Sequence, residues 1–222
     1  MNCKNCKSTC IKKGFNGKTQ KYFCKTCKVY QQHSYTYHIC TKQDIDSISK
    51  LTCIGVGISG IAKYTGISKS NVINIIKKIA ATISLQIPNE SSQVYEMDEM
   101  HTFIKSKPNS NYLIYAINKT KNQVVDFVVG ARTKCNIKKI TDSLIRLNPQ
   151  KIFTDKLNIY PSLLSKNIHK ASVYKINHIE RFNLTLRTHL KRLSRKTICF
   201  SKSILMLECI IKIYLHRLNT NH

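Results

Sequence analysis

Apolar residues in the second half of the chain recur at two different periods, which predict two kinds of element. Short alternating or continuous apolar runs predict strands, and they lie at residues 93–98, 112–117, 124–129, 151–154 and 171–174. Apolar residues every three or four positions predict helices, and they cover residues 137–147, 159–164, 178–194 and 201–216. Three strands followed by alternating helices and strands indicate an α/β domain over residues 93–222, with helices on the faces of a mixed sheet.

Residues 41–86 carry helical spacing and predict a helix-turn-helix. A first helix at 58–65 is followed by Gly66, which permits a sharp turn, and by Ser68, a favourable N-cap for a second helix. Polar residues gather where a recognition helix meets base edges and phosphates; they are Lys69, Ser70, Asn71 and Asn74. An ordinary helical hairpin is the alternative. The polar stretch 87–92 is the expected linker to the α/β domain.

Cysteines cluster at the start of the chain, within residues 1–40. Two CxxC pairs, Cys3/Cys6 and Cys24/Cys27, are separated by 17 residues, a spacing typical of a four-cysteine zinc site. Glycines between the pairs favour a hairpin that closes the site. We therefore predict a zinc ribbon at 1–40, with reduced surface thiols as the alternative. Cys10 is expected to play a structural or incidental role.

The charge balance points to a polyanionic partner. The chain has 37 Lys and Arg against 11 Asp and Glu, a net charge of +26. Such self-repulsion favours double-stranded DNA or another nucleic acid as the partner, although a ribosomal or generic basic protein has the same signature. No apolar run is long enough to span a membrane, and the N-terminus lacks the pattern of a signal peptide. We expect a cytoplasmic, nucleoid-associated protein.

The scarce acids fall at the ends of predicted strands and on a helix. Asp98 ends the first strand of the α/β domain, Asp155 follows the strand at 151–154, and Glu180 opens the helix at 178–194. Such carboxylates can hold Mg²⁺ ions that clamp the attacking and leaving oxygens of a phosphodiester. The order of elements fits a ribonuclease-H-like fold. The alternative is that the acids pair with the chain's own cations. Glu96 and Glu99 are expected to matter less.

Two cations follow Glu180 on the same side of its helix. Arg187 and Lys191 recur at helical spacing from Glu180, which would place positive charge beside the metals and against a DNA backbone. A solvated basic face is the alternative interpretation.

These segments together resemble the insertion-sequence-one family of bacterial transposases. The most specific segment is IERFNLTLRTHLKRLSRKTICFSKS, residues 179–203, which looks like the family's signature around its catalytic glutamate. Asp98 stands in Met97-Asp-Glu-Met100, similar to the family's first aspartate motif, and Asp155 stands in a Thr-Asp pair similar to the second. The resemblance implies a DDE catalytic domain in which Asp98, Asp155 and Glu180 act together.

The resemblance also implies an activity. A metal-dependent transposase would bind the terminal inverted repeats of its own element, cleave a strand and transfer it to target DNA, as at least a homodimer. The chain departs from the family at His101, where Trp is usual, and at Lys156-Leu157, where Gly-Trp is usual. A non-enzymatic DNA-binding repressor or a decayed copy therefore stays as the alternative. A ribosome-associated RNA-binding protein fits the charge and the zinc but neither the helix-turn-helix nor the segment around Glu180.

Overall fold

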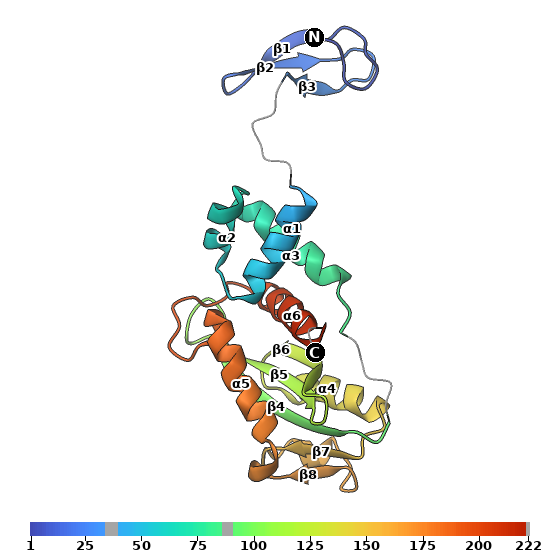
Figure 1. Ribbon diagram of the computed structural model, residues 1–222, viewed down its shortest axis with the longest axis vertical. Helices are drawn as coiled ribbons and strands as arrows, with labels where there is room; N and C mark the ends of the chain where they lie inside the picture. The colour runs from blue at the N-terminus through green and yellow to red at the C-terminus, as the bar shows by residue number, and fades with distance from the viewer. Residues whose placement is uncertain (34–39, 86–90, 221–222) are drawn as a thin grey trace. The chain divides into compact units, whose positions relative to one another are not determined.

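The computed structural model describes residues 1–33, 40–85 and 91–220 (Figure 1). They fall into two compact units, Met1–Ile39 and Cys40–His222. The predicted linker at 87–92 lies outside the described residues except for Ser91 and Ser92.

The first unit is a small antiparallel sheet with almost no apolar core. Its strands are β1 (Ile11–Asn16), β2 (Thr19–Phe23) and β3 (Tyr30–Gln32), in the order β1-β2-β3. Gly17 takes a positive φ of 58° in the turn between β1 and β2, as the predicted hairpin requires. The buried residues that form its core are Cys3, Cys10 and Cys24. So little apolar burial leaves the fold dependent on a cross-link.

A mixed five-stranded sheet lies at the centre of the second unit. Its order is β6-β5-β4-β7-β8, with β4, β5 and β6 antiparallel and β7 and β8 parallel to β4. The strands span β4 (Val94–Phe103), β5 (Ser110–Asn118), β6 (Gln123–Gly130), β7 (Lys151–Thr154) and β8 (His169–Ala171). The five strands occur in the predicted order, which confirms the mixed α/β architecture.

Several predicted elements differ in detail. The strand predicted at 93–98 continues to Phe103, so Asp98 lies inside β4 and not at its end. The last strand ends at Ala171, not at Tyr174, because its pairing with β7 fixes it at His169–Ala171. The segment expected to be a helix at 159–164 forms only a 3-10 turn, η1 (Tyr160–Ser162), with Pro161 inside it. A second 3-10 turn, η2 (Val173–Lys175), leads into the next helix.

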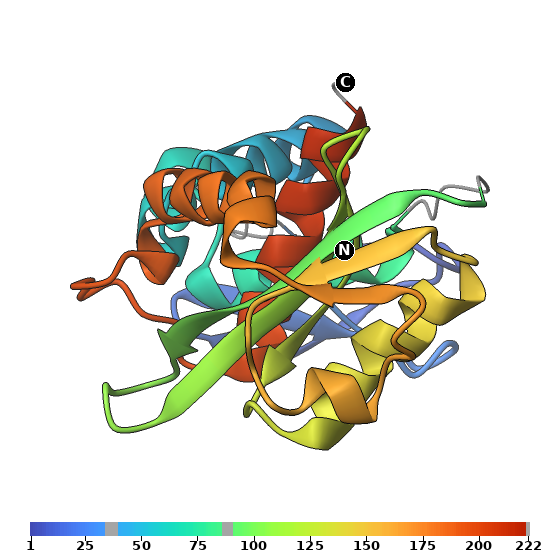
Figure 2. The same cartoon turned by 90° about the horizontal axis from the view of Figure 1, so that it is seen from below.

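Helices cover both faces of the sheet (Figure 2). Helix α4 (Lys134–Arg146) packs on one face, where Ile137 and Leu144 meet Met97 and Ile114. Helices α5 (Asn177–His189) and α6 (Ile204–Thr220) pack on the other face. The sheet therefore has two separate cores, and a residue of β4 faces one or the other according to its position in the strand.

Three more helices form a layer beyond α6, and the first and third of them pack against it directly (Figure 1). They are α1 (Lys42–Cys53), α2 (Ile58–Thr65) and α3 (Lys69–Thr82), so the two helices at 58–79 lie where the spacing predicts them. The sequence suggested separate domains at 41–86 and 93–222, whereas the structure joins them through one core. The reason is α6, whose apolar residues pack against the sheet on one side and against α1 and α3 on the other. A helix that is apolar on most of its circumference is buried.

A close contact also joins the turn after α1 to α5. Gly55 has a φ of 79°, and a Cβ at this position would overlap the carbonyl oxygen of His189. Only glycine fits both the conformation and the space.

Candidate active site and metal centres

The four cysteines of the two CxxC pairs meet in the first unit. Their Sγ atoms approach to between 2.9 and 3.6 Å for the Cys3–Cys27, Cys6–Cys24, Cys24–Cys27 and Cys6–Cys27 pairs. A tetrahedral zinc with Zn–S bonds of about 2.3 Å sets sulfurs about 3.8 Å apart. The thiols would need to separate by only about 1 Å or less, so this donor set fits zinc.

Neighbouring groups prepare the sulfur of Cys3 for a metal. The side-chain amide of Gln31, which is buried, donates to Cys3 Sγ at 2.8 Å, and its oxygen accepts from Lys4 N at 2.9 Å. The backbone N–H of Cys6 lowers the pKa of the Cys3 thiol to about 6. Cys10 is buried beside the cluster but lies outside the four-sulfur group, and burial raises the pKa of its thiol. Gln31 is a polar residue that the sequence did not single out.

The sheet register brings Asp98 and Asp155 together. Glu96 of β4 pairs with Phe153 of parallel β7, so the same register carried two residues further places Asp98 level with Asp155. Carboxylate oxygens of Asp98, Glu99 and Asp155 lie within 4.8 Å of one another. Oxygens around one Mg²⁺ stand up to about 4.2 Å apart, so this hard-oxygen donor set fits a divalent cation.

Glu99 joins the cluster, although the sequence suggested that it matters less. Its carboxylate accepts a hydrogen bond from the hydroxyl of Tyr160 in η1. Burial raises the pKa of Glu99 to about 7, with Asp155 and Asp98 adding to the effect. The sequence signal for this role is that Glu99 is the residue next to Asp98. In the structure both residues lie where β4 extends beyond the end of the shorter β7.

A chain of hydrogen bonds from α5 orients Asp98. Asn183 Nδ2 donates to Asp98 Oδ2 at 2.7 Å, and the Tyr115 hydroxyl donates to Asn183 Oδ1 at 2.9 Å. Burial raises the pKa of Asp98, while the bond from Asn183 opposes the rise. Asn183 and Tyr115 are therefore positioning residues that sequence reasoning missed; no local pattern in either segment marks them.

Glu180 is not brought into the cluster. It lies in the first turn of α5 with an exposed side chain, about one helical turn before Asn183. The metal-ligand group in the described part of the chain contains Asp98, Glu99 and Asp155 without it.

Glu96 is a fully buried carboxylate that holds the start of α5 against β4. It accepts from the backbone N–H of Ile179 at 2.9 Å and contacts His178 Nδ1 at 3.0 Å and Lys119 Nζ at 3.1 Å. An anion at a helix N-terminus is favourable because unpaired N–H groups point at it. Glu96 stands among the apolar residues of β4, which helices cover on both faces. An acid in such a strand is expected to be buried.

Of the two cations expected beside the acids, Arg187 lies on α5 and is half-buried, while Lys191 lies beyond it. The predicted helix at 178–194 ends at His189 and is followed by a 3-10 turn, η3 (Lys191–Leu193). Lys191 is exposed there. The helical alignment of Lys191 with Glu180 therefore does not continue.

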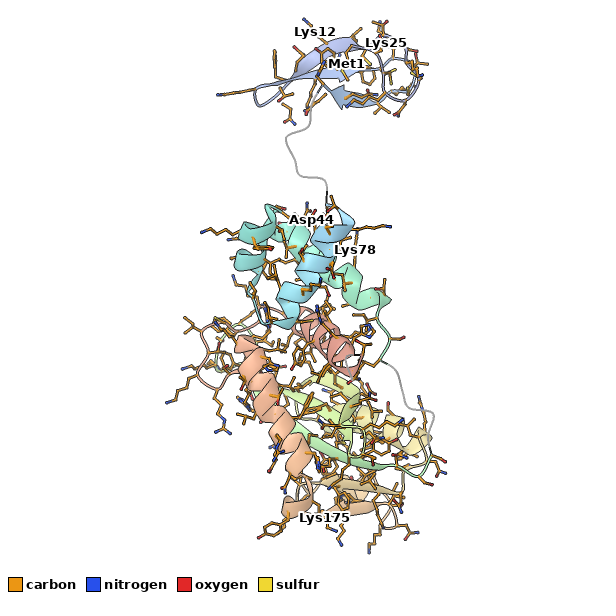
Figure 3. The ribbon with its side chains drawn as sticks, viewed as in Figure 1. Met1, Lys12, Lys25, Asp44, Lys78 and Lys175 are labelled. Carbon is orange, nitrogen blue, oxygen red and sulfur yellow. The ribbon has the colours of Figure 1, made fainter. Side chains whose placement is uncertain are left out.

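The polar residues at the start of α3 are all at the surface. Ser68 caps the helix by accepting from Asn71 N at 3.3 Å, as predicted. The exposed side chains are those of Lys69, Ser70, Asn71 and Asn74. Lysines are spread over both units, and the surface positions include Lys12, Lys25, Lys78 and Lys175 (Figure 3). Across the described residues, every helix is too short or too polar to cross a membrane.

Comparisons with known proteins identify the family of the chain. A model of the IS1 transposase family matches residues 93–220. The protein InsB of insertion element iso-IS1n from Shigella dysenteriae is 34% identical over 124 residues, which are 56% of this chain and 95% of that protein. InsB of the IS1 element from Shigella flexneri is 35% identical over 127 residues, 57% of this chain and 95% of that protein.

A third relative, InsB of IS1 4 from Escherichia coli (strain K12), is 35% identical over 127 residues, 57% of this chain and 74% of that protein. A solved simian T-cell lymphotropic virus intasome in complex with PP2A regulatory subunit B56 gamma has a chain that is 17% identical. That match covers 75% of this chain and 66% of the other, at a TM-score of 0.41, too low to carry an argument.

The family match covers more than half of the 222 residues and includes Asp98, Asp155 and Glu180. The chain belongs to the IS1 transposase family.

Proposed function

We propose that this chain is an active DNA transposase that cuts and joins DNA strands at the cluster of Asp98, Glu99 and Asp155. The observation that carries the proposal is the meeting of these three carboxylates at the end of β7, within 4.8 Å. The sheet order, with three antiparallel strands and two parallel ones, supports a ribonuclease-H-like catalytic domain.

The chain's own residues divide the work. Asp98 and Asp155 would hold a divalent cation such as Mg²⁺, which when bound supplies Lewis-acid activation of the phosphodiester and of the attacking oxygen. Asn183 fixes the orientation of Asp98. Glu96 fixes the start of α5. The three carboxylates are half-buried beside the sheet, which strengthens their electrostatic interactions.

The third carboxylate has two candidates. The sequence motif favours Glu180, which would reach the site from the exposed first turn of α5. The geometry favours Glu99, which already lies in the cluster. Our proposal keeps Glu180 as the catalytic residue of the triad, with Glu99 as a neighbour that tunes the charge of the site.

Cleavage of a duplex carrying the element end, with Mg²⁺ present, tests the proposal. Asp98→Ala and Asp155→Ala should each abolish cleavage while end binding persists, and Asp46→Ala, an exposed acid on α1, should cut normally. Glu180→Ala should also abolish cleavage, and Glu99→Ala should retain part of it; the opposite order would transfer the third role to Glu99. A wild-type chain that binds ends without ever cutting would instead support the repressor or decayed copy.

End binding is proposed to reside in α3 and in the zinc ribbon of the first unit. The exposed residues at the start of α3 follow its N-cap, Ser68. This end of a recognition helix is the one that meets DNA. Asn71→Ala should relax sequence preference by about 1–3 kcal/mol, and Lys69→Ala should weaken binding to all sequences alike. An unchanged sequence preference in Asn71→Ala would show that another surface of the chain recognises the DNA sequence.

Pairing of two element ends would require at least two copies of the chain at the bacterial nucleoid. Analytical ultracentrifugation with and without end duplex measures this directly, and a complex with one copy on two ends would contradict it.

A further inference from the structure

A pocket of about 410 Å³ lies beside the acidic cluster. Its walls include His101 and Phe103 at the end of β4, Arg187 of α5, and Ser194 and Arg195 after η3. A volume of this size falls within the roughly 300–1,000 Å³ of pockets that hold small molecules. It is larger than a single phosphate group needs.

The pocket is lined by two arginines, Arg187 and Arg195, and the nearby carboxylate of Asp98 attracts Arg187 without forming a salt bridge to it. Among residues 91–220, neither Arg187 nor Arg195 forms a salt bridge. Burial lowers the pKa of Arg187, and the nearby Arg195 lowers it further. Two guanidinium groups that line one pocket repel each other, and an anion bound between them would relieve the repulsion.

The walls of the pocket are fixed in place. Arg187 Nη1 donates to the carbonyl oxygen of Leu193 at 3.2 Å, and Ser194 Oγ donates to the carbonyl oxygen of Arg187 at 2.9 Å. On the opposite wall, His101 Nε2 is 3.0 Å from Ser110 Oγ, and its ring meets Tyr112 edge-on at 5.3 Å. These contacts hold Arg187 and the imidazole of His101 in position before a ligand arrives.

The pocket lies within a few nucleotides of the proposed cutting site. His101 follows Asp98 by three residues of strand, about 10 Å. Arg187 follows Asn183, the partner of Asp98, by four residues of helix, about 6 Å. One strand of DNA rises about 3.4 Å per nucleotide, so the pocket is at most about three nucleotides from the acids.

We propose that this pocket binds a backbone phosphate of the DNA strand, one to three nucleotides from the cleaved bond, with its nucleoside against the His101 ring. Arg187 and Arg195 hold the phosphate oxygens, which guanidinium groups match bidentately. The inference rests on the proposed function, because it assigns DNA as the ligand. Its role is to fix the register of the strand over the carboxylates, which raises the rate by positioning.

The first experiment measures how binding of the end duplex depends on salt, without added Mg²⁺. Each phosphate contact contributes about 0.9 to the slope of log K against log salt concentration. Arg195→Ala should lower the slope by about that amount, whereas Arg146→Ala should leave it unchanged. Arg146 is the matched control because it is an exposed arginine on α4, which packs on the other face of the sheet. Equal slopes for wild type and Arg195→Ala, or an equal decrease in both variants, would overturn the pocket.

A second measurement uses the wild-type chain, so it does not depend on the folding of a variant. Phenylglyoxal modification of arginines is followed by peptide mass spectrometry, with a single-stranded octanucleotide or with inorganic phosphate at the same phosphate concentration. The octanucleotide should protect Arg187 and Arg195 several-fold and leave Arg146 unprotected. An unchanged rate at Arg195 would overturn the inference, and equal protection by inorganic phosphate would make the pocket a free-phosphate site.

The two proposals fail in different ways. Protection of Arg195 by DNA together with absent cleavage would leave the pocket standing and remove the catalytic function. Cleavage by wild type with no protection at Arg195 would support the proposed function and refute the proposed phosphate pocket.

Discussion

The buried carboxylate of Glu96 should be worth far more to stability than an exposed one. Its side chain is 0% exposed and contacts Lys119, whose side chain is 31% exposed, at 3.1 Å. The backbone N–H of Ile179 donates to the same carboxylate at 2.9 Å in a buried setting. Glu96→Ala leaves that N–H without a partner and Lys119 without its counter-ion.

The expected loss follows from these contacts. A buried donor left unpaired costs about 1–3 kcal/mol, and breaking a buried ion pair costs about 3–5 kcal/mol. Part of the second cost is absent here because water reaches Lys119. We therefore expect Glu96→Ala to lower the free energy of unfolding by roughly 2–4 kcal/mol. Glu96→Gln should lose about half as much, because its oxygen can still accept from Ile179.

Asp46→Ala provides the matched control. Asp46 contacts Lys50 at 2.6 Å, but their side chains are 59% and 56% exposed. Such an i, i+4 pair on a helix surface is worth about 0.3–0.5 kcal/mol.

Urea titration followed by circular dichroism at the helix band measures both variants. The described residues of the first unit contain no helix, so this signal reports the second unit. The slope with urea should stay constant while the midpoint falls. A loss below about 1 kcal/mol for Glu96→Ala, or a loss equal to that of Asp46→Ala, would refute the assignment of Glu96 as the residue that fixes α5 to β4.

Three further predictions concern the cysteine site, the acidic cluster and the helical turn. Cys24→Ser should release zinc and unfold the first unit, because metal binding is folding energy there, whereas Cys10→Ala should keep a full equivalent of zinc by metal analysis. Without metal, burial raises the pKa of Glu99 in the folded chain to about 7 from the ordinary value of 4.5. The folded state therefore binds the extra proton, and stability should fall as pH rises from about 4.5 to about 7; urea midpoints should show this fall in wild type and lose it in Glu99→Gln. Gly55→Ala should destabilise the second unit severely by overlap with the last carbonyl of α5, whereas Gly57→Ala, which meets open space, should melt close to wild type.

Local patterns were sufficient to predict most of the strands and helices and the two CxxC pairs of the cysteine site. Alternation and helical spacing depend on neighbours in sequence, and a CxxC turn carries both of its ligands. Asp98 and Asp155 were predicted to meet because each was placed at a strand end. Their meeting then followed from the parallel register of β4 and β7.

Long-range contacts explain what the sequence did not reveal. Glu99 enters the cluster only because Tyr160, more than sixty residues away, holds its carboxylate. Asn183 matters because Tyr115 and Asp98 lie on either side of it. The joining of the two predicted domains depended on α6, whose apolar run was read as a helix but whose second packing partner lay far earlier in the chain.

Binding of Mn²⁺, measured from the electron paramagnetic resonance signal of the free ion, tests the central claim most directly. The claim is that Asp98 and Asp155 hold a divalent cation at the cluster, and Mn²⁺ accepts the same oxygen ligands as Mg²⁺. Wild type and the Asp46→Ala control should both remove free Mn²⁺ from solution, and Asp98→Ala combined with Asp155→Ala should leave it free. Equal Mn²⁺ binding by the double variant and by wild type would contradict the account.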